Sequence, residues 1–123
     1  MSVNIGNLDG APQILEVRNG LVLINGDPQP IKYLTEDQVR DFARELEAIP
    51  DDGDPGRAAL RDAKRIDFLL GMLEHAFGDE CTDYLEHLIG QLHYNVSVYL
   101  GETEPWEEKD AGKYFGKLTI KAR

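Results

Sequence analysis

The cysteine and the histidines are the residues whose chemistry could support a covalent reaction. Cys81 lies near His75 and His87 in the sequence, so a thiol nucleophile with an imidazole base is one interpretation. Carboxylates close to the cysteine oppose a further negative charge on its sulfur. These carboxylates are Asp79, Glu80 and Asp83. We therefore expect Cys81 to be a small, partly buried thiol, and we assign no catalytic residue.

A metal site has equally little support. Asp83 and His87 stand four residues apart and would share one face of a helix, but no defined third ligand accompanies them. Asp51, Asp52 and Asp54 lack the ordered ligand spacing of a calcium loop. The sequence also has no glycine-rich phosphate loop and no hydrolase motif. We expect a protein that is not an enzyme and that needs no cofactor or metal.

The net charge of −10 limits the kinds of partner. General nucleic-acid binders contact phosphates through clustered lysine and arginine, so we expect no direct general nucleic-acid binding. A protein partner with a basic surface suits the charge better. A hydrophobic content of 41% still predicts a core, and 123 residues predict a single compact domain over residues 1–123.

The sequence also predicts where the protein is found. No apolar run approaches the ~20 residues of a membrane helix, and the first residues lack the basic start and apolar core of a secretion signal. One cysteine cannot form an internal disulfide, which agrees with a reducing compartment. We expect no membrane association and a cytoplasmic location, in the host cell cytoplasm if the gene belongs to a phage.

The N-terminal part of the chain predicts a β-hairpin that begins at Gln13. Asn19-Gly20 lies between two apolar stretches and is typical of a type I′ turn, which would place Val17 opposite Val22 on the core face. A second turn at residues 25–28 is predicted to lead into a short edge strand, PIKYL, over residues 30–34.

Three helices are predicted in the middle of the chain. The first begins at the capping box of Thr35 and Gln38 and ends at Pro50. The second extends to Gly78, and Asp79 is predicted to cap the third. The apolar positions expected to face the core are Val39, Phe42, Ala43, Leu46 and Ile49, then Ala59, Ala63, Ile66, Leu70, Leu73 and Phe77, and then Tyr84, Leu85, Leu88, Ile89 and Leu92.

From His93 onward the apolar period changes to two, which predicts a C-terminal hairpin with strands at residues 93–100 and 116–123. Together with the N-terminal hairpin it predicts an α+β fold, in which about three central helices pack on one face of an antiparallel sheet. The alternative is a helical core with two separate β-ribbons, one of which pairs with a second subunit. That alternative leaves a homodimer open.

Two surfaces are candidate binding sites. The first combines the acidic face of the first helix with the loop around Trp106, because an aromatic side chain ringed by charge is typical of a binding hot spot. The second is the polar face of the C-terminal hairpin, which would suit a nucleotide or another anion. A solvated face is the simpler alternative for both. The first set is Asp37, Asp41, Glu45, Trp106, Glu107 and Glu108, and the second is His93, Asn95, Tyr99, Lys117, Lys121 and Arg123.

In size, acidity and lack of catalytic motifs, the sequence resembles small intracellular binding proteins such as phage-encoded inhibitors of host defence and bacterial immunity proteins. The resemblance is one of type and rests on no shared motif. It implies a non-enzymatic protein that binds and neutralises a macromolecular partner. The alternatives are a small-molecule binder that sequesters a nucleotide or another anionic ligand, and a phage assembly or structural protein that self-associates.

Overall fold

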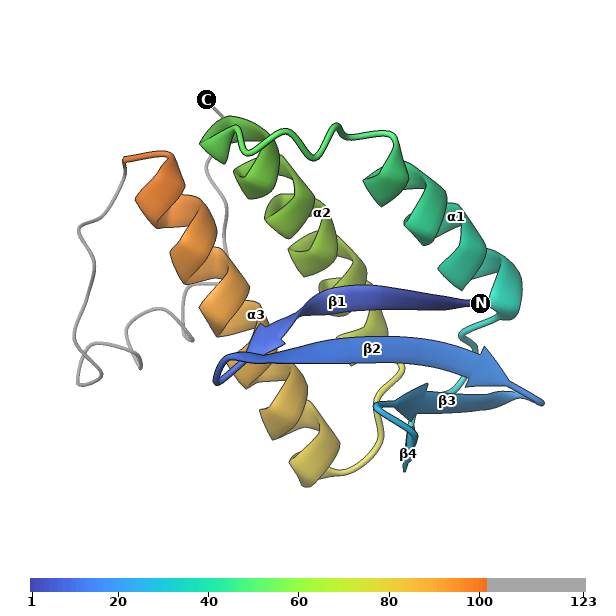
Figure 1. Cartoon of the computed structure of the whole chain (residues 1–123). Coiled ribbons are helices and arrows are strands. Elements are labelled where there is room, and N and C mark those ends of the chain that lie inside the picture. Colours follow the sequence, from blue (N-terminus) through green and yellow to red (C-terminus); the bar gives the residue numbers. More distant parts are fainter. Residues whose placement is uncertain (102–123) are drawn as a thin grey trace.

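In the computed structural model, which describes residues 1–101, one antiparallel sheet precedes three helices. The elements are β1 (Ser2–Leu8), β2 (Ala11–Arg18), β3 (Leu21–Ile24), β4 (Asp27–Gln29), α1 (Glu36–Glu47), α2 (Pro55–Leu73) and α3 (Asp79–Tyr99). The strands are neighbours in chain order, β1-β2-β3-β4, so the sheet is a meander. Figure 1 shows β1 and β2 crossing in front of α2 and α3, with α1 to the side of α2. The predicted α+β class is confirmed.

Two-residue turns connect the strands, and in each an aspartate or asparagine precedes a glycine. Asp9-Gly10, Asn19-Gly20 and Asn25-Gly26 have positive φ at both positions, as a type I′ turn requires. Such turns fix the strand register. The register predicted for β2 and β3 is confirmed, since Val17 pairs with Val22.

Strand β1 was not predicted, because an irregularity interrupts its alternation. Its pairing with β2 shifts between Asn4 and Asn7. Gly6, between them, has a φ of 126°, and its N–H donates a hydrogen bond to Asn4 Oδ1 at 2.7 Å. A Cβ on Gly6 would lie 2.8 Å from Leu92 Cδ2 of α3. Glycine therefore allows the helix to approach β1 closely.

The strand predicted at residues 30–34 is also wrong. The chain forms β4 directly after the Asn25-Gly26 turn, and Pro28 pairs with Leu23 at the sheet edge. A proline is tolerated there because an edge strand needs hydrogen bonds on one side only. Between β4 and α1, Ile31 forms an isolated bridge with Ala76.

Helix α1 begins where the capping box predicts. The Gln38 N–H donates to Thr35 Oγ1 at 3.2 Å, and the Thr35 N–H donates to Gln38 Oε1 at 2.8 Å. These reciprocal bonds satisfy two backbone N–H groups that have no acceptor within the helix. The predicted apolar residues of this helix are buried: Val39, Phe42, Ala43, Leu46 and Ile49.

Helix α2 is shorter than predicted and its buried face is rotated. It ends at Leu73, so Phe77 lies beyond it and is 44% exposed. Gly78, and not Asp79, is the N-cap of α3. Because α2 contacts α3 as well as β1 and α1, its most buried line keeps the predicted Ala59 and Ile66 but otherwise passes through other residues than predicted. The buried residues are Ala59, Asp62, Ile66, Leu69 and Met72.

The predicted strand at residues 93–100 is wrong, because α3 continues to Tyr99. The alternation of tyrosine and valine residues suggested a strand. The side chains that are buried recur at three- and four-residue steps, however, and this is the period of a helix. The buried apolar residues of α3 include Leu85, Leu88, Ile89, Leu92 and Val96. The second predicted strand, at 116–123, lies outside the described residues. No helix within residues 1–101 combines the length and apolar character needed to cross a membrane.

A largely buried ion pair connects α2 to the edge of β1. Arg65 Nη1 lies 2.9 Å from Asp62 Oδ1, and Arg65 Nε donates to the carbonyl of Asn4 at 3.0 Å. The Asp62 and Arg65 side chains are 12% and 18% exposed. Burial raises the pKa of Asp62, although the Arg65 guanidinium and the Asn95 side chain act in the opposite direction.

Candidate functional site

The acidic row predicted on the first helix is present on α1. Asp37, Asp41 and Glu45 are exposed and stand at four-residue steps. Asp37 pairs with Arg40 at 2.8 Å, whereas Asp41 and Arg44 are 3.9 Å apart. Within the described residues, Glu45 forms no ion pair. The negative field of the row is therefore strongest at its C-terminal end, at Asp41 and Glu45.

Those two carboxylates border a groove between α1 and α2, which we call the α1–α2 groove. It encloses about 260 Å³, and its lining is Gln38, Asp41, Phe42, Glu45, Lys64, Asp67 and Phe68. The Phe42 and Phe68 rings stack with centroids 4.1 Å apart and planes at 2°. The groove is thus lined by two stacked aromatic rings, three carboxylates and one lysine.

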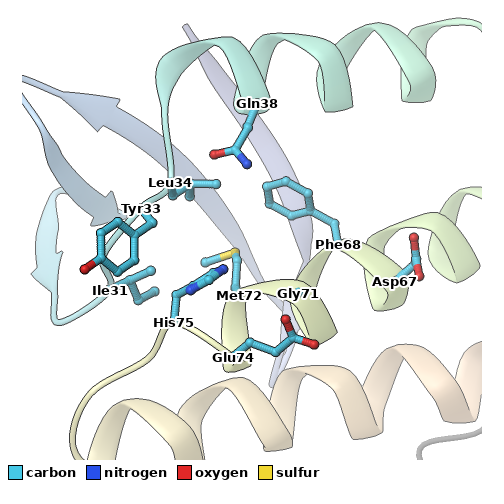
Figure 2. Close-up of a pocket in the computed structure, with 10 residues that line it drawn as sticks. All are labelled: Ile31, Tyr33, Leu34, Gln38, Asp67, Phe68, Gly71, Met72, Glu74 and His75. Carbon is cyan, nitrogen blue, oxygen red and sulfur yellow. The ribbon is translucent and has the colours of Figure 1, made fainter.

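A second hollow adjoins the groove and shares Gln38, Asp67 and Phe68 with it. We call it the Tyr33 cavity, and it encloses about 210 Å³. Its lining is Ile31, Tyr33, Leu34, Gln38, Asp67, Phe68, Gly71, Met72, Glu74 and His75. Figure 2 shows Leu34 and Gln38 on one side of the cavity, with Met72 and His75 on the other. Apolar side chains thus form much of the lining, together with a smaller number of polar groups.

Tyr33 has an unusual backbone for its residue type. Its φ is 65°, whereas the other non-glycine residues with positive φ in the described chain are an aspartate and two asparagines in turns, which tolerate that conformation. The Tyr33 side chain is 76% exposed and meets His75 edge-on, with ring centroids 5.8 Å apart. Strained residues of this kind cluster at binding sites.

Two backbone hydrogen bonds hold the residues that precede Tyr33. The Lys32 N–H donates to the carbonyl of His75 at 3.1 Å, and the Phe77 N–H donates to the carbonyl of Pro30 at 2.7 Å. Lys32 Nζ lies 4.8 Å from the centre of the Phe77 ring. The segment before α1 is thus hydrogen-bonded to the connection between α2 and α3. These bonds fix the position of the chain that leads to Tyr33 beside the cavity.

The cavity lining is acidic. Asp67 and Glu74 are exposed, and neither forms an ion pair with another described residue. No lysine or arginine is part of the lining. A cation entering the cavity would therefore find carboxylates that no internal cation neutralises, whereas an anion would be repelled.

The strand face predicted to carry His93, Asn95 and Tyr99 of the anion site is not present. Because residues 93–99 are helical, the alternating side chains do not share one face. His93 is buried, Asn95 lies beside Asp62, and Tyr99 is 50% exposed. The other residues of both predicted sites lie outside residues 1–101: Trp106, Glu107, Glu108, Lys117, Lys121 and Arg123.

Cys81 is buried, and burial raises the pKa of its thiol. A nucleophilic cysteine needs the opposite shift, since the thiolate is the reactive form. Within the part of the chain that the structure describes, no three His, Cys, Asp or Glu side chains are grouped so that they could hold a metal ion. The geometry therefore directs attention to the α1–α2 groove and the Tyr33 cavity.

The α2 side of this site was not found from the sequence. The sequence suggested His75 as a base near Cys81 and placed Tyr33 in an edge strand, and neither prediction brings the two residues to one cavity. The only signal in the sequence was Tyr33, an aromatic residue two positions before the capping box. Its position reveals a cavity only once the packing of α1 against α2 is known.

No protein-family model, curated protein or solved structure matches the chain.

Proposed function

We propose that this chain is a small, acidic, non-enzymatic binding protein that binds and neutralises a protein partner through a basic surface of that partner. The observation that carries the proposal is the composition of the α1–α2 groove and the adjoining Tyr33 cavity. Together their linings hold four carboxylates and one lysine around an aromatic floor. Carboxylates steer a basic partner during encounter, and apolar area stabilises the complex once formed.

Neutralisation follows from the same charges. A partner that binds an anionic substrate, such as a nucleic acid, does so with clustered lysine and arginine. An acidic groove placed against that cluster competes with the substrate for the same cations. An inhibitor of the phage anti-defence or immunity type would act in this way, and no reaction at the groove is needed.

Charge reversal in the groove tests this proposal. We expect Asp41→Lys with Glu45→Lys to reduce partner capture by about tenfold or more, because steering and rim contacts both change sign. Tagged protein would be used for capture from a lysate of the cells in which it naturally occurs, and captured proteins would be quantified by mass spectrometry. Circular dichroism would verify that the variant keeps its helices.

The matched control is Asp83→Lys with Glu86→Lys, which changes the net charge equally on exposed positions of α3. We expect this control to capture the same partner nearly as well as the native chain. Capture that is undiminished in the groove variant would contradict the proposal. An equal loss in both variants would show that net charge alone is responsible and would also contradict it.

A further inference from the structure

The Tyr33 cavity has the dimensions of a socket for one long side chain. Its volume of about 210 Å³ corresponds to about seven liquid waters, which is close to the bulk of an extended arginine or lysine side chain. The apolar part of the lining, with Ile31, Leu34 and Met72, suits an aliphatic stem. A whole peptide segment would not fit. The cavity therefore suits a single side chain of the partner, and the α1–α2 groove suits the partner surface around that side chain.

The charge of the lining selects a cation. Asp67 and Glu74 contribute carboxylates, and the lining contains no lysine or arginine. Gln38 does not add to this preference, since its oxygen already accepts the Thr35 N–H at 2.8 Å and only its N–H donors are left for a ligand. Figure 2 shows this amide beside the cavity. A positively charged group that also has an apolar stem is the best match to these neighbours.

The rings favour a guanidinium over an ammonium group. Tyr33, Phe68 and His75 all contribute to the lining, so that flat surfaces lie on several sides of the cavity. A guanidinium is planar, stacks on such rings and is less strongly hydrated than an ammonium ion. It can also form two parallel hydrogen bonds to one carboxylate.

Gly71 is the member of the cavity lining that has no side chain. A glycine inside a helix destabilises it relative to alanine. Gly71 lies in the last turn of α2 and in the cavity lining, it is exposed, and a Cβ built on it would meet nothing within 4 Å. A larger residue would therefore be accommodated by the fold, but it would occupy the socket.

We propose that the Tyr33 cavity binds an arginine side chain of the basic partner, with the guanidinium between the aromatic rings and its N–H groups directed at Glu74 or Asp67. This inference rests on the proposed function, because it assigns the partner residue that anchors the complex. The rest of the basic surface then lies along the α1–α2 groove.

The test uses blocked pentapeptides of glycine and serine with arginine, lysine or citrulline at the centre. Binding would be followed by NMR through the backbone amide shifts of Gly71, Met72 and His75. We expect saturable shifts with the arginine peptide, about threefold weaker binding of the lysine peptide, and at least about tenfold weaker binding of the neutral citrulline peptide. Equal binding of citrulline, or tighter binding of lysine, would overturn the proposal.

Two variants locate the site. Gly71→Leu should abolish the shifts at Met72 and His75 while the thermal midpoint stays at or above that of the native chain, because leucine favours the helix. Glu74→Gln should weaken arginine binding about fivefold, whereas the matched Glu86→Gln on α3 should leave it unchanged. Undiminished arginine binding in Gly71→Leu would place the arginine elsewhere and overturn the proposal.

The outcomes separate this inference from the proposed function. If Asp41→Lys with Glu45→Lys loses the partner but the arginine peptide produces no saturable shift at millimolar concentration, the function stands and the arginine socket is rejected. If the peptide binds as expected but the charge-reversed variant captures the partner undiminished, the socket stands and the proposed function is rejected.

Discussion

Replacing Arg65 with methionine is expected to lower the free energy of unfolding by about 3 kcal/mol at pH 7. Methionine keeps much of the apolar stem but removes the guanidinium that lies 2.9 Å from Asp62. A largely buried carboxylate then remains without its cation, and leaving a buried charge uncompensated costs more than a pair of charges contributes. The carbonyl of Asn4 also loses a donor.

This loss should depend on pH because of Asp62. Burial already holds its pKa in the folded chain above the ordinary value of 3.8, and removing Arg65 removes an interaction that lowers it. As the pH falls through the raised pKa, the folded chain takes up a proton that the unfolded chain has not yet bound, so folding is favoured. The variant therefore regains stability relative to the native chain between neutral pH and about pH 4.

Urea unfolding at pH 7 and at about pH 5, followed by circular dichroism, would measure both effects. The control is the double variant Asp62→Asn with Arg65→Met, which contains no buried charge at this position. We expect it to be more stable than the single variant at pH 7, with little dependence on pH. A single variant that is as stable as the native chain, or equally impaired at both pH values, would contradict the interpretation.

Gly6→Ala is expected to destabilise the protein by about 3 kcal/mol, from the sum of backbone strain and overpacking. At a φ of 126° a residue with a Cβ is strained. The added carbon would also lie 2.8 Å from Leu92 Cδ2 and 3.0 Å from Leu92 Cδ1. Leu92 is 1% exposed, so the core gives it little space in which to move aside.

Gly20→Ala separates the two contributions. Gly20 also has positive φ, but a Cβ there would meet nothing within 4 Å. We expect a loss of about 1 kcal/mol, due to the left-handed backbone alone. Thermal and urea unfolding of both variants would give the difference between them. If the losses were equal, α3 would adjust to the new methyl group, and close packing at Gly6 would not explain why glycine is needed.

Short-range signals account for what the sequence predicted well. Asn19-Gly20 determines both the turn and the register of the strands beside it, and the interaction between Thr35 and Gln38 spans only three residues. In both cases the residues that determine the structure also make the contacts. Such features can be recognised without knowing what packs against them.

The wrong predictions depended on tertiary contacts. Residues 93–99 contain strand-forming tyrosine and valine, and only the burial of Leu92 and Val96 against the core makes the helical period decisive. In β1 the alternation is interrupted at Gly6, whose role is apparent once Leu92 lies against it. Local propensity was outweighed at both places by packing between distant segments.

The sequence located only the α1 side of the α1–α2 groove. The α1 acids could be placed on one face from their spacing, and Asp41 and Glu45 do border the groove. Asp67 and Glu74 could not be assigned to the same surface, because the rotation of α2 about its axis differs from the predicted one. The left-handed backbone of Tyr33 has no signature in residue type, since tyrosine rarely adopts it.

The meander has a consequence for the order in which the protein folds. Each strand pairs with the next across a two-residue turn, and such hairpins close quickly and at small entropic cost. The contact between the β1–β2 turn and α3 is of the opposite kind: Gln91 Oε1 accepts a hydrogen bond from the Asp9 N–H across 82 positions of the sequence. Closure of that long loop, and not assembly of the sheet, is therefore expected to limit the folding rate.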